Sequence, residues 1–360
     1  MSRSSPRMIV TAGGGGVGKT TTSAALALAL AARGHRTLAL TVDPARRLAD
    51  ALGVRVGAGI QPVRVASGAA FDLAMPAPEA ALPDLAHALF EDPEARDAFM
   101  ANALFATLAD APAGMHEILV LLGLGGALAA ANEPYDAIVL DTAPSRHALD
   151  FLSFPGELAG LLSGPSVGFF ASFADRAGPA AAAAASRSRI LGWGKARLEG
   201  AIRRVLPPEF LVEGARFFAD LAPIREALVA RAEGADRLLR GAQFLLVTAP
   251  TRAARQDALR LAQALPRRAR GVILNRADDG LRPELAEALE RVPQPPAAAM
   301  LRAEAQGRRD ALRATQATLA GRLPGVPVLP LPTRHEEAPE DIVRALAPSL
   351  DALAARLMAA

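Results

Sequence analysis

A glycine-rich loop near the N-terminus constrains the fold more than any other feature of this sequence. The loop reads Gly13-Gly14-Gly15-Gly16-Val17-Gly18-Lys19-Thr20, and it joins an apolar β-rich run, Met8–Ala12, to a helical run, Thr20–Arg33. Glycines let consecutive backbone N–H groups point inward around phosphate oxygens, and the following helix offers them its positive dipole end. The motif G-x-x-x-x-G-K-[ST] in this strand–loop–helix setting predicts a nucleotide-binding phosphate loop.

Two residues of the loop carry side-chain chemistry of their own. Lys19 would place a compact positive charge on the β- and γ-phosphates, and Thr20 would offer its hydroxyl to Mg²⁺. Lys19 is one of only two lysines in a chain that otherwise uses arginine, the second being Lys195. The planar fork of arginine is too large for a phosphate cradle, which explains a lysine at this position.

Seven short β-rich runs predict the fold class. Most are continuously apolar, as in parallel strands buried on both faces, and helical patterns such as Ala253–Leu265 lie between several of them. This alternation predicts an α/β fold, a P-loop NTPase with a mostly parallel, doubly wound sheet. The runs are Met8–Ala12, Thr37–Val42, Val63–Ala66, Ala137–Asp141, Gln243–Thr248, Gly271–Asn275 and Val326–Pro330.

Two long intervals interrupt this pattern and predict an inserted helical subdomain. We expect residues 1–70, 132–155 and 241–360 to form the P-loop core, and residues 71–131 and 156–240 to form the helical subdomain. The stretch 158–174 is apolar enough to be either a core helix or a groove for an apolar partner.

Two aspartates follow predicted strands. Asp43 comes after Thr37–Val42, and Asp141 closes Ala137–Leu140. Ligands of open α/β sheets bind beyond the carboxyl ends of the strands, so both should lie near the phosphate loop. We expect Asp141 to hold Mg²⁺ through water and Asp43 to orient or deprotonate the attacking water. The alternative for each is a capping or turn aspartate.

The composition excludes several kinds of site and partner. The 360 residues include no cysteine, which excludes disulfides, thiolate zinc and thiol-bound metalloid. A net charge of +3 is too weak to indicate a nucleic-acid partner. The N-terminal apolar run is too short for a signal peptide, and no apolar stretch is long enough to span a bilayer. We therefore expect a cytoplasmic protein.

Three segments together resemble the ArsA-type ATPases, a deviant-Walker P-loop family. This family includes the arsenite-pump ATPase and the targeting ATPase for tail-anchored membrane proteins. The segments are GGGGVGKTTTSAALALALA, TVDPARRLADALG and DTAPSRHALDFL, and the last is the most specific. The resemblance implies ATP and Mg²⁺ as cofactors, hydrolysis of ATP, and a homodimer or heterodimer closed by ATP. It also implies that the helical inserts form a surface for an apolar client or membrane-protein partner.

The resemblance also implies roles for single residues. His147 matches a switch-two histidine, for which a structural turn role is the alternative. The other implied roles are phosphate binding by Gly13, Gly15, Gly16, Gly18 and Lys19, with Val17 in the same loop and Thr21 beside the α-phosphate; Mg²⁺ binding by Thr20 and Asp141; handling of water by Asp43; and adenine contact by Asn275.

The chain departs from the family at the first lysine of the phosphate loop. In the family this lysine reaches across the dimer to the partner's nucleotide, and here its position is Gly14. A cation supplied in trans is worth about 10³–10⁵ in rate, so hydrolysis is slow, or another cation serves, or a partner chain supplies the lysine. Arg46, Arg47 and Arg146 are the candidates within the chain, although solvated surface roles are the alternative for each.

Two other functions remain open at this point. One is a positioning ATPase of the ParA/MinD kind, although those are shorter and lack large helical inserts. Residues 341–360 are one candidate for its membrane helix, but their few basic residues favour docking on the core. The basic, amphipathic stretch 187–204 is the other candidate, with a solvated helix face as its alternative. The other is a slow or non-hydrolysing half of a heterodimer, which the glycine at position 14 favours and the two aspartates oppose.

Overall fold

The fold comes from a computed structural model, and the chain divides into two compact units. Unit 1 comprises Met1–Ala77, Ala131–Leu149 and Leu238–Ala360, and unit 2 comprises Pro78–Ala130 and Asp150–Arg237. The structure describes residues 6–41, 47–55, 57, 59–64, 68–76, 78–102, 105, 119–123, 134–142, 154–163, 217, 219–265, 268–278, 287–288, 291 and 296–359.

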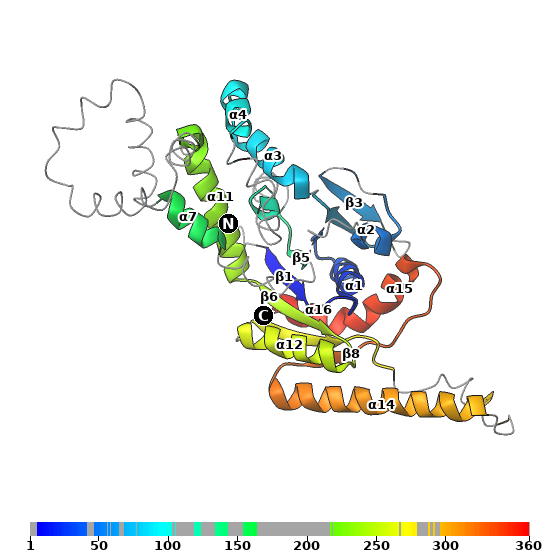
Figure 1. The fold of residues 1–360 in the computed structure, drawn as a ribbon. Coiled ribbons are helices and arrows are strands. Elements are labelled where there is room, and N and C mark those ends of the chain that lie inside the picture. The colour runs from blue at the N-terminus through cyan, green and yellow to red at the C-terminus, as the bar shows by residue number, and fades with distance from the viewer. Residues whose placement is uncertain are drawn as a thin grey trace, which may run out of the picture. The chain divides into compact units, whose positions relative to one another are not determined.

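Unit 1 is built on an eight-stranded, mostly parallel sheet (Figure 1). The strand order is β3-β4-β2-β5-β1-β6-β7-β8, and all neighbours are parallel except β3 and β4. The central strands are buried along their length, which explains their continuous apolar runs and confirms the predicted α/β sheet. The strands are β1 (Arg7–Ala12), β2 (Thr37–Thr41), β3 (Ile60–Arg64), β4 (Ala70–Ala74), β5 (Ala137–Asp141), β6 (Gln243–Thr248), β7 (Ala269–Leu274) and β8 (Val328–Pro330).

One edge of the sheet was not expected from the sequence. Strand β4 pairs with β3 as an antiparallel hairpin and with β2 in parallel, so residues 71–74 belong to the sheet. The prediction that the helical insertion starts at residue 71 was therefore wrong, and the first helix after the sheet edge begins at Pro78. In β4 only Phe71, Leu73 and Ala74 are buried, and so short an alternation is a weak strand signal.

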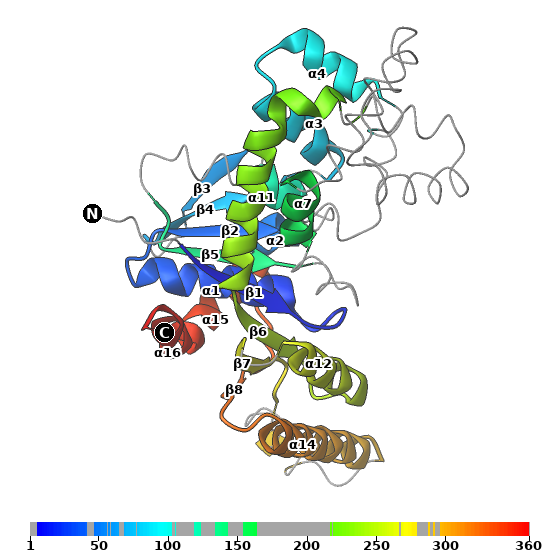
Figure 2. The same ribbon diagram turned by 90° about the vertical axis from the view of Figure 1, so that its left-hand side faces the viewer.

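The helices of unit 1 cover both faces of the sheet (Figure 2). The crossovers β1–α1–β2 and β6–α12–β7 run in opposite directions along the sheet, and right-handed crossovers of this kind place their helices on opposite faces. Helices α2, α15 and α16 pack around α1, whereas α14 packs on α12. The helices are α1 (Lys19–Ala32), α2 (Arg47–Leu52), α12 (Arg252–Ala264), α14 (Pro296–Arg322), α15 (Pro339–Leu346), the short 3₁₀ helix η4 (Ala347–Leu350) and α16 (Asp351–Ala359).

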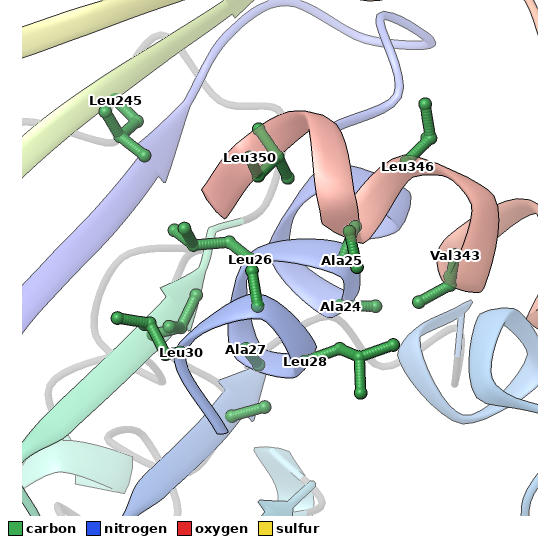
Figure 3. Packing of buried hydrophobic residues seen from close by; sticks show 14 of the residues in the cluster. Ala24, Ala25, Leu26, Ala27, Leu28, Leu30, Leu245, Val343, Leu346 and Leu350 are labelled. Carbon is green, nitrogen blue, oxygen red and sulfur yellow. The ribbon is translucent and has the colours of Figure 1, made fainter. Parts of the chain in front are cut away.

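Helix α1 is the centre of the apolar core of unit 1. All residues from Thr22 to Leu30 are buried, so the helix is surrounded by protein rather than amphipathic. Figure 3 shows Leu350 and Val343, from the C-terminal segment, beside Ala24, Ala25 and Leu26. Residues 341–360 were expected to dock on the core, and within them Leu346, Leu350, Leu353 and Leu357 are indeed buried.

All regular elements that the structure describes in unit 2 are helices. Phe99 is at the centre of an aromatic cluster, with ring centroids 5.3 Å from Phe90 and 5.2 Å from Phe105 and Phe217. Arg231 donates hydrogen bonds to Ala88 O and Leu122 O, and burial lowers the pKa of its guanidinium. The elements are α3 (Pro78–Leu89), α4 (Pro93–Met100), α7 (Phe154–Ser163), the 3₁₀ helix η3 (Ala222–Ile224) and α11 (Arg225–Arg240).

Neither unit contains, in its described ranges, a helix long and apolar enough to cross a bilayer.

Truncation of Leu26 tests the importance of the α1 core. Leu26 is fully buried, so Leu26→Ala should lower the free energy of unfolding by about 2–5 kcal/mol through lost apolar contact and a residual cavity. The same substitution at Leu301, which is 37% exposed on α14, should cost less than about 1 kcal/mol. Urea unfolding followed by circular dichroism measures both, and equal losses would contradict the assignment of α1 as the core.

Candidate functional site

The phosphate loop follows β1 and is packed against two other strands of unit 1. A Cβ atom at Gly13 would lie 2.2 Å from Val247 O in β6, and one at Gly18 would lie 2.2 Å from Asn275 Nδ2 after β7. Gly16 and Gly18 also have φ angles of 71° and 91°, which side chains other than glycine rarely adopt. Close approach of other atoms requires glycine at Gly13 and Gly18, and the backbone conformation requires it at Gly16 and Gly18. A loop of this conformation can turn consecutive N–H groups inward to form a cradle for phosphate.

Lys19 lies at the point where the loop becomes helix α1. Its ammonium donates a hydrogen bond to Gly14 O at 2.9 Å, and its side chain is buried although it is charged. Gly18, at the N-cap, provides no side-chain cap for the first turn of α1. The N–H groups of that turn and the Lys19 ammonium thus make this end of the helix a strongly positive site suited to phosphate.

Three polar residues lie in one row at or next to the carboxyl ends of neighbouring strands. Asp141 of β5 is in register with Thr11 of β1 on one side and with Thr41 of β2 on the other. Paired residues of parallel strands project to the same face, and Ser23 of α1 meets them there, with its Oγ 2.7 Å from Thr11 Oγ1. The row lies at the carboxyl ends of the strands, where α/β sheets bind ligands.

The carboxylate of Asp141 is buried among hydroxyl groups. Thr20 Oγ1 donates to Asp141 Oδ2 at 2.8 Å, Thr41 Oγ1 lies 3.4 Å from the same oxygen, and Ser23 Oγ lies 3.2 Å from Oδ1. Hydrogen bonds of this kind offset the high cost of burying a carboxylate. Thr20 and Asp141 form an all-oxygen donor set beside the phosphate loop, and this set fits Mg²⁺.

Asn275 joins the loop after β7 to the phosphate loop. Its amide Nδ2 donates to Val17 O at 2.9 Å and closely approaches Gly18, while its backbone N–H donates to Thr248 O at 2.8 Å. One N–H of the amide is therefore occupied by the phosphate loop. The side-chain oxygen and the second N–H are what the amide has left for a ligand.

Gly14 faces an acidic side chain rather than a basic one. A Cβ atom at Gly14 would lie 3.0 Å from Asp257 Oδ2 of α12. The other oxygen of Asp257 accepts a hydrogen bond from Arg260 at 3.1 Å. A negative charge therefore stands beside the position at which the resembling family has a lysine.

The sequence singled out further residues. Thr21 lies in the first turn of α1, beside Thr20, and Arg47 begins α2 and is exposed. The remaining ones, namely Asp43, Arg46, Arg146 and His147, lie outside the described residues.

The structure adds residues that the sequence reasoning missed. Ser23 is one turn along α1 from Thr20, and Thr41 ends the strand that precedes Asp43, so helical spacing and strand ends carried a signal for both. No sequence pattern predicted that Asp257 would lie beside Gly14, because α12 and the phosphate loop are far apart in the sequence.

Comparison with known proteins agrees with this geometry. Residues 6–164 match the model of the anion-transporting ATPase (ArsA) family, which is a P-loop NTPase family. The chain is also 30% identical over 238 residues to a protein of Chlorobaculum tepidum that is provisionally named an arsenical pump-driving ATPase. That match covers 64% of this chain and 53% of the relative, so the chain spans about half the length of that protein. The predicted resemblance to ArsA-type ATPases and the predicted fold class are thus confirmed.

Gly18→Ala tests whether close approach of Asn275 requires glycine in the loop. The substitution should lower the free energy of unfolding by about 2–3 kcal/mol, because a left-handed φ and the lost Asn275 contact both cost energy. Gly34→Ala is the matched control, since Gly34 has a φ of 84° with nothing within 4 Å of an added Cβ, and should cost about 1–2 kcal/mol. Thermal unfolding of both variants gives the comparison, and the requirement is refuted if Gly18→Ala costs no more than the control.

Proposed function

We propose that this chain is an Mg²⁺-dependent ATP hydrolase of the ArsA type that works as a dimer. In this proposal the nucleotide state of a homodimer or heterodimer controls the binding of an apolar client or membrane-protein partner. The observation that carries the proposal is the hydrogen bond between Thr20 and the buried Asp141, directly beside a glycine cradle and Lys19. The match of residues 6–164 to the anion-transporting ATPase family supports it.

Each residue of the site has a task in this mechanism. The N–H groups of the loop and of the first turn of α1 would bind the phosphates, and Lys19 would place its charge on the β- and γ-phosphates. Thr20 and Asp141 would hold Mg²⁺, which when bound supplies charge neutralisation of the phosphate oxygens. Asp43 would orient the attacking water, and Asn275 would contact adenine.

A second candidate function is a slow or non-hydrolysing half of a heterodimer. The carboxylate of Asp257 beside Gly14 favours this candidate, because it places negative charge where a cation would speed hydrolysis. The ParA/MinD alternative has less support, since one of its two candidate membrane segments, the C-terminal helix, has its leucines buried in the core of unit 1.

Steady-state ATP hydrolysis at increasing protein concentration tests the proposed function. The rate per chain should rise with concentration as dimers form, and Lys19→Ala should lower it by at least about 100-fold, because it removes the charge on the transferred phosphate. Lys195→Ala is the matched control and should leave the rate unchanged. Activity that is independent of concentration and of Lys19 would refute the mechanism.

A lysine at position 14 tests whether hydrolysis lacks a cation supplied in trans. Gly14→Lys alone should change turnover little, because Asp257 Oδ2 lies 3.0 Å from the new Cβ and would pair with the ammonium. Combining it with Asp257→Asn should free the lysine and raise kcat at least about tenfold above Asp257→Asn alone. An equal or lower kcat in the double variant would show that this charge is not limiting.

A further inference from the structure

The carboxylate of Asp141 is held by two hydroxyl groups of one helix. Thr20 and Ser23 lie three residues apart in α1, and side chains at this spacing project from the same face of a helix. Thr20 donates to Oδ2 of Asp141 at 2.8 Å, and Ser23 Oγ lies 3.2 Å from Oδ1. Each oxygen of the carboxylate thus has a hydroxyl of α1 beside it, and the pair fixes the plane of the carboxylate relative to the helix.

The two oxygens of Asp141 have different surroundings. Oδ2 lies beside Thr20, which is only half-buried and which the proposed function assigns to Mg²⁺, and Thr41 reaches the same oxygen from β2 at 3.4 Å. Oδ1 lies beside Ser23, which is fully buried. Oδ2 is therefore the oxygen on the side of the proposed metal site, and Oδ1 is held in the interior.

Ser23 has one hydroxyl proton and two acceptors for it. Lys19 O, one turn earlier in α1, lies 2.9 Å from Ser23 Oγ, and Asp141 Oδ1 lies 3.2 Å away. The regular α-helical pattern already gives Lys19 O the backbone N–H of residue 23, and an ionised carboxylate is a stronger acceptor than a neutral carbonyl. We expect the proton of Ser23 to go to Oδ1 when Asp141 is charged.

Thr11 supports this bond from β1. Its Oγ1 lies 2.7 Å from Ser23 Oγ and 3.2 Å from Leu140 O. When Ser23 gives its proton to Asp141, its oxygen can accept the proton of Thr11, and hydrogen bonds that run in one direction strengthen one another. Thr11, Ser23 and Asp141 then form a chain of hydrogen bonds from β1 through α1 to β5 that ends on the charge.

We infer that Ser23 is a positioning residue for the divalent cation, because its bond to Oδ1 holds the Asp141 carboxylate with Oδ2 on the side of Thr20. The inference rests on the proposed function, since it requires that Thr20 and Asp141 bind Mg²⁺ together with a nucleotide. Ser23 is fully buried and acts through Asp141. Groups that hold a metal-binding side chain in place are typically worth about 10–100-fold in metal affinity.

Calorimetric binding of ADP, once at saturating Mg²⁺ and once in EDTA, tests the inference without turnover. The ratio of the two affinities measures how much more tightly the ion binds to the protein–ADP complex than to ADP alone. Ser23→Ala should reduce this ratio at least about tenfold, because Asp141 loses the donor at Oδ1. The affinity in EDTA should stay within about twofold of wild type, because Ser23 is buried and makes no phosphate contact in the proposed site.

Two further variants separate the hydroxyl from general packing. Ser23→Thr keeps a hydroxyl and should keep the ratio within about threefold of wild type. If its extra methyl group prevents folding, Ser23→Cys replaces it, and the weaker S–H donor should give a ratio between those of wild type and Ser23→Ala. Thr37→Val is the matched control, since Thr37 is a buried threonine at the opposite end of β2 that donates to His35 O, and it should leave the ratio unchanged.

The possible results separate this inference from the proposed function. If ADP does not bind, or if Lys19→Ala leaves its affinity or Thr20→Val leaves the ratio unchanged, the proposed function fails and the inference with it. If Thr20→Val lowers the ratio but Ser23→Ala leaves it within about twofold of wild type, the inference alone is overturned. Equal losses of the ratio in Ser23→Ala and Ser23→Thr, or an equal loss of affinity in EDTA, would also overturn it, provided that circular dichroism shows the variants to be folded.

Discussion

The buried carboxylate of Asp141 is the constraint on which the arrangement of the site depends. A charge in the interior needs hydrogen bonds, and Asp141 obtains them from α1 and β2, with Thr11 of β1 joined to the same network through Ser23. The requirement fixes the register of the three strands at their carboxyl ends and the position of α1 above them. The phosphate loop, which joins β1 to α1, has little freedom once these elements are fixed.

The opposite side of the loop is held by backbone proximity instead of by a buried charge. Gly13 and Gly18 let β6 and Asn275 approach to distances that no side chain would permit, and the Asp278–Thr333 pair extends the connection to the loop after β8. The two sides therefore have different chemistry. Hydroxyl and carboxylate oxygens suit a metal on one side, whereas the other side presents the amide of Asn275.

The sequence predicted the sheet, the phosphate loop and the neighbourhood of Lys19, Thr20 and Asp141, because local patterns and strand ends determine them. It missed β4, whose alternation is short and lies next to a long helical interval. It also missed the contacts of Gly14 with Asp257 and of Asp278 with Thr333. Such pairs join loops and helices that are distant in the sequence, and only the three-dimensional crossing of strands brings them together.

Burial of α1 by the C-terminal segment has a consequence for how the chain is made. Leu26 is covered by residues such as Leu350, which leave the ribosome roughly 300 residues later. At ordinary translation speeds the interval is on the order of twenty seconds to a minute, during which this apolar helix lacks its cover. The face of α1 that α15, η4 and α16 cover therefore lacks its native partners until these elements have been synthesised.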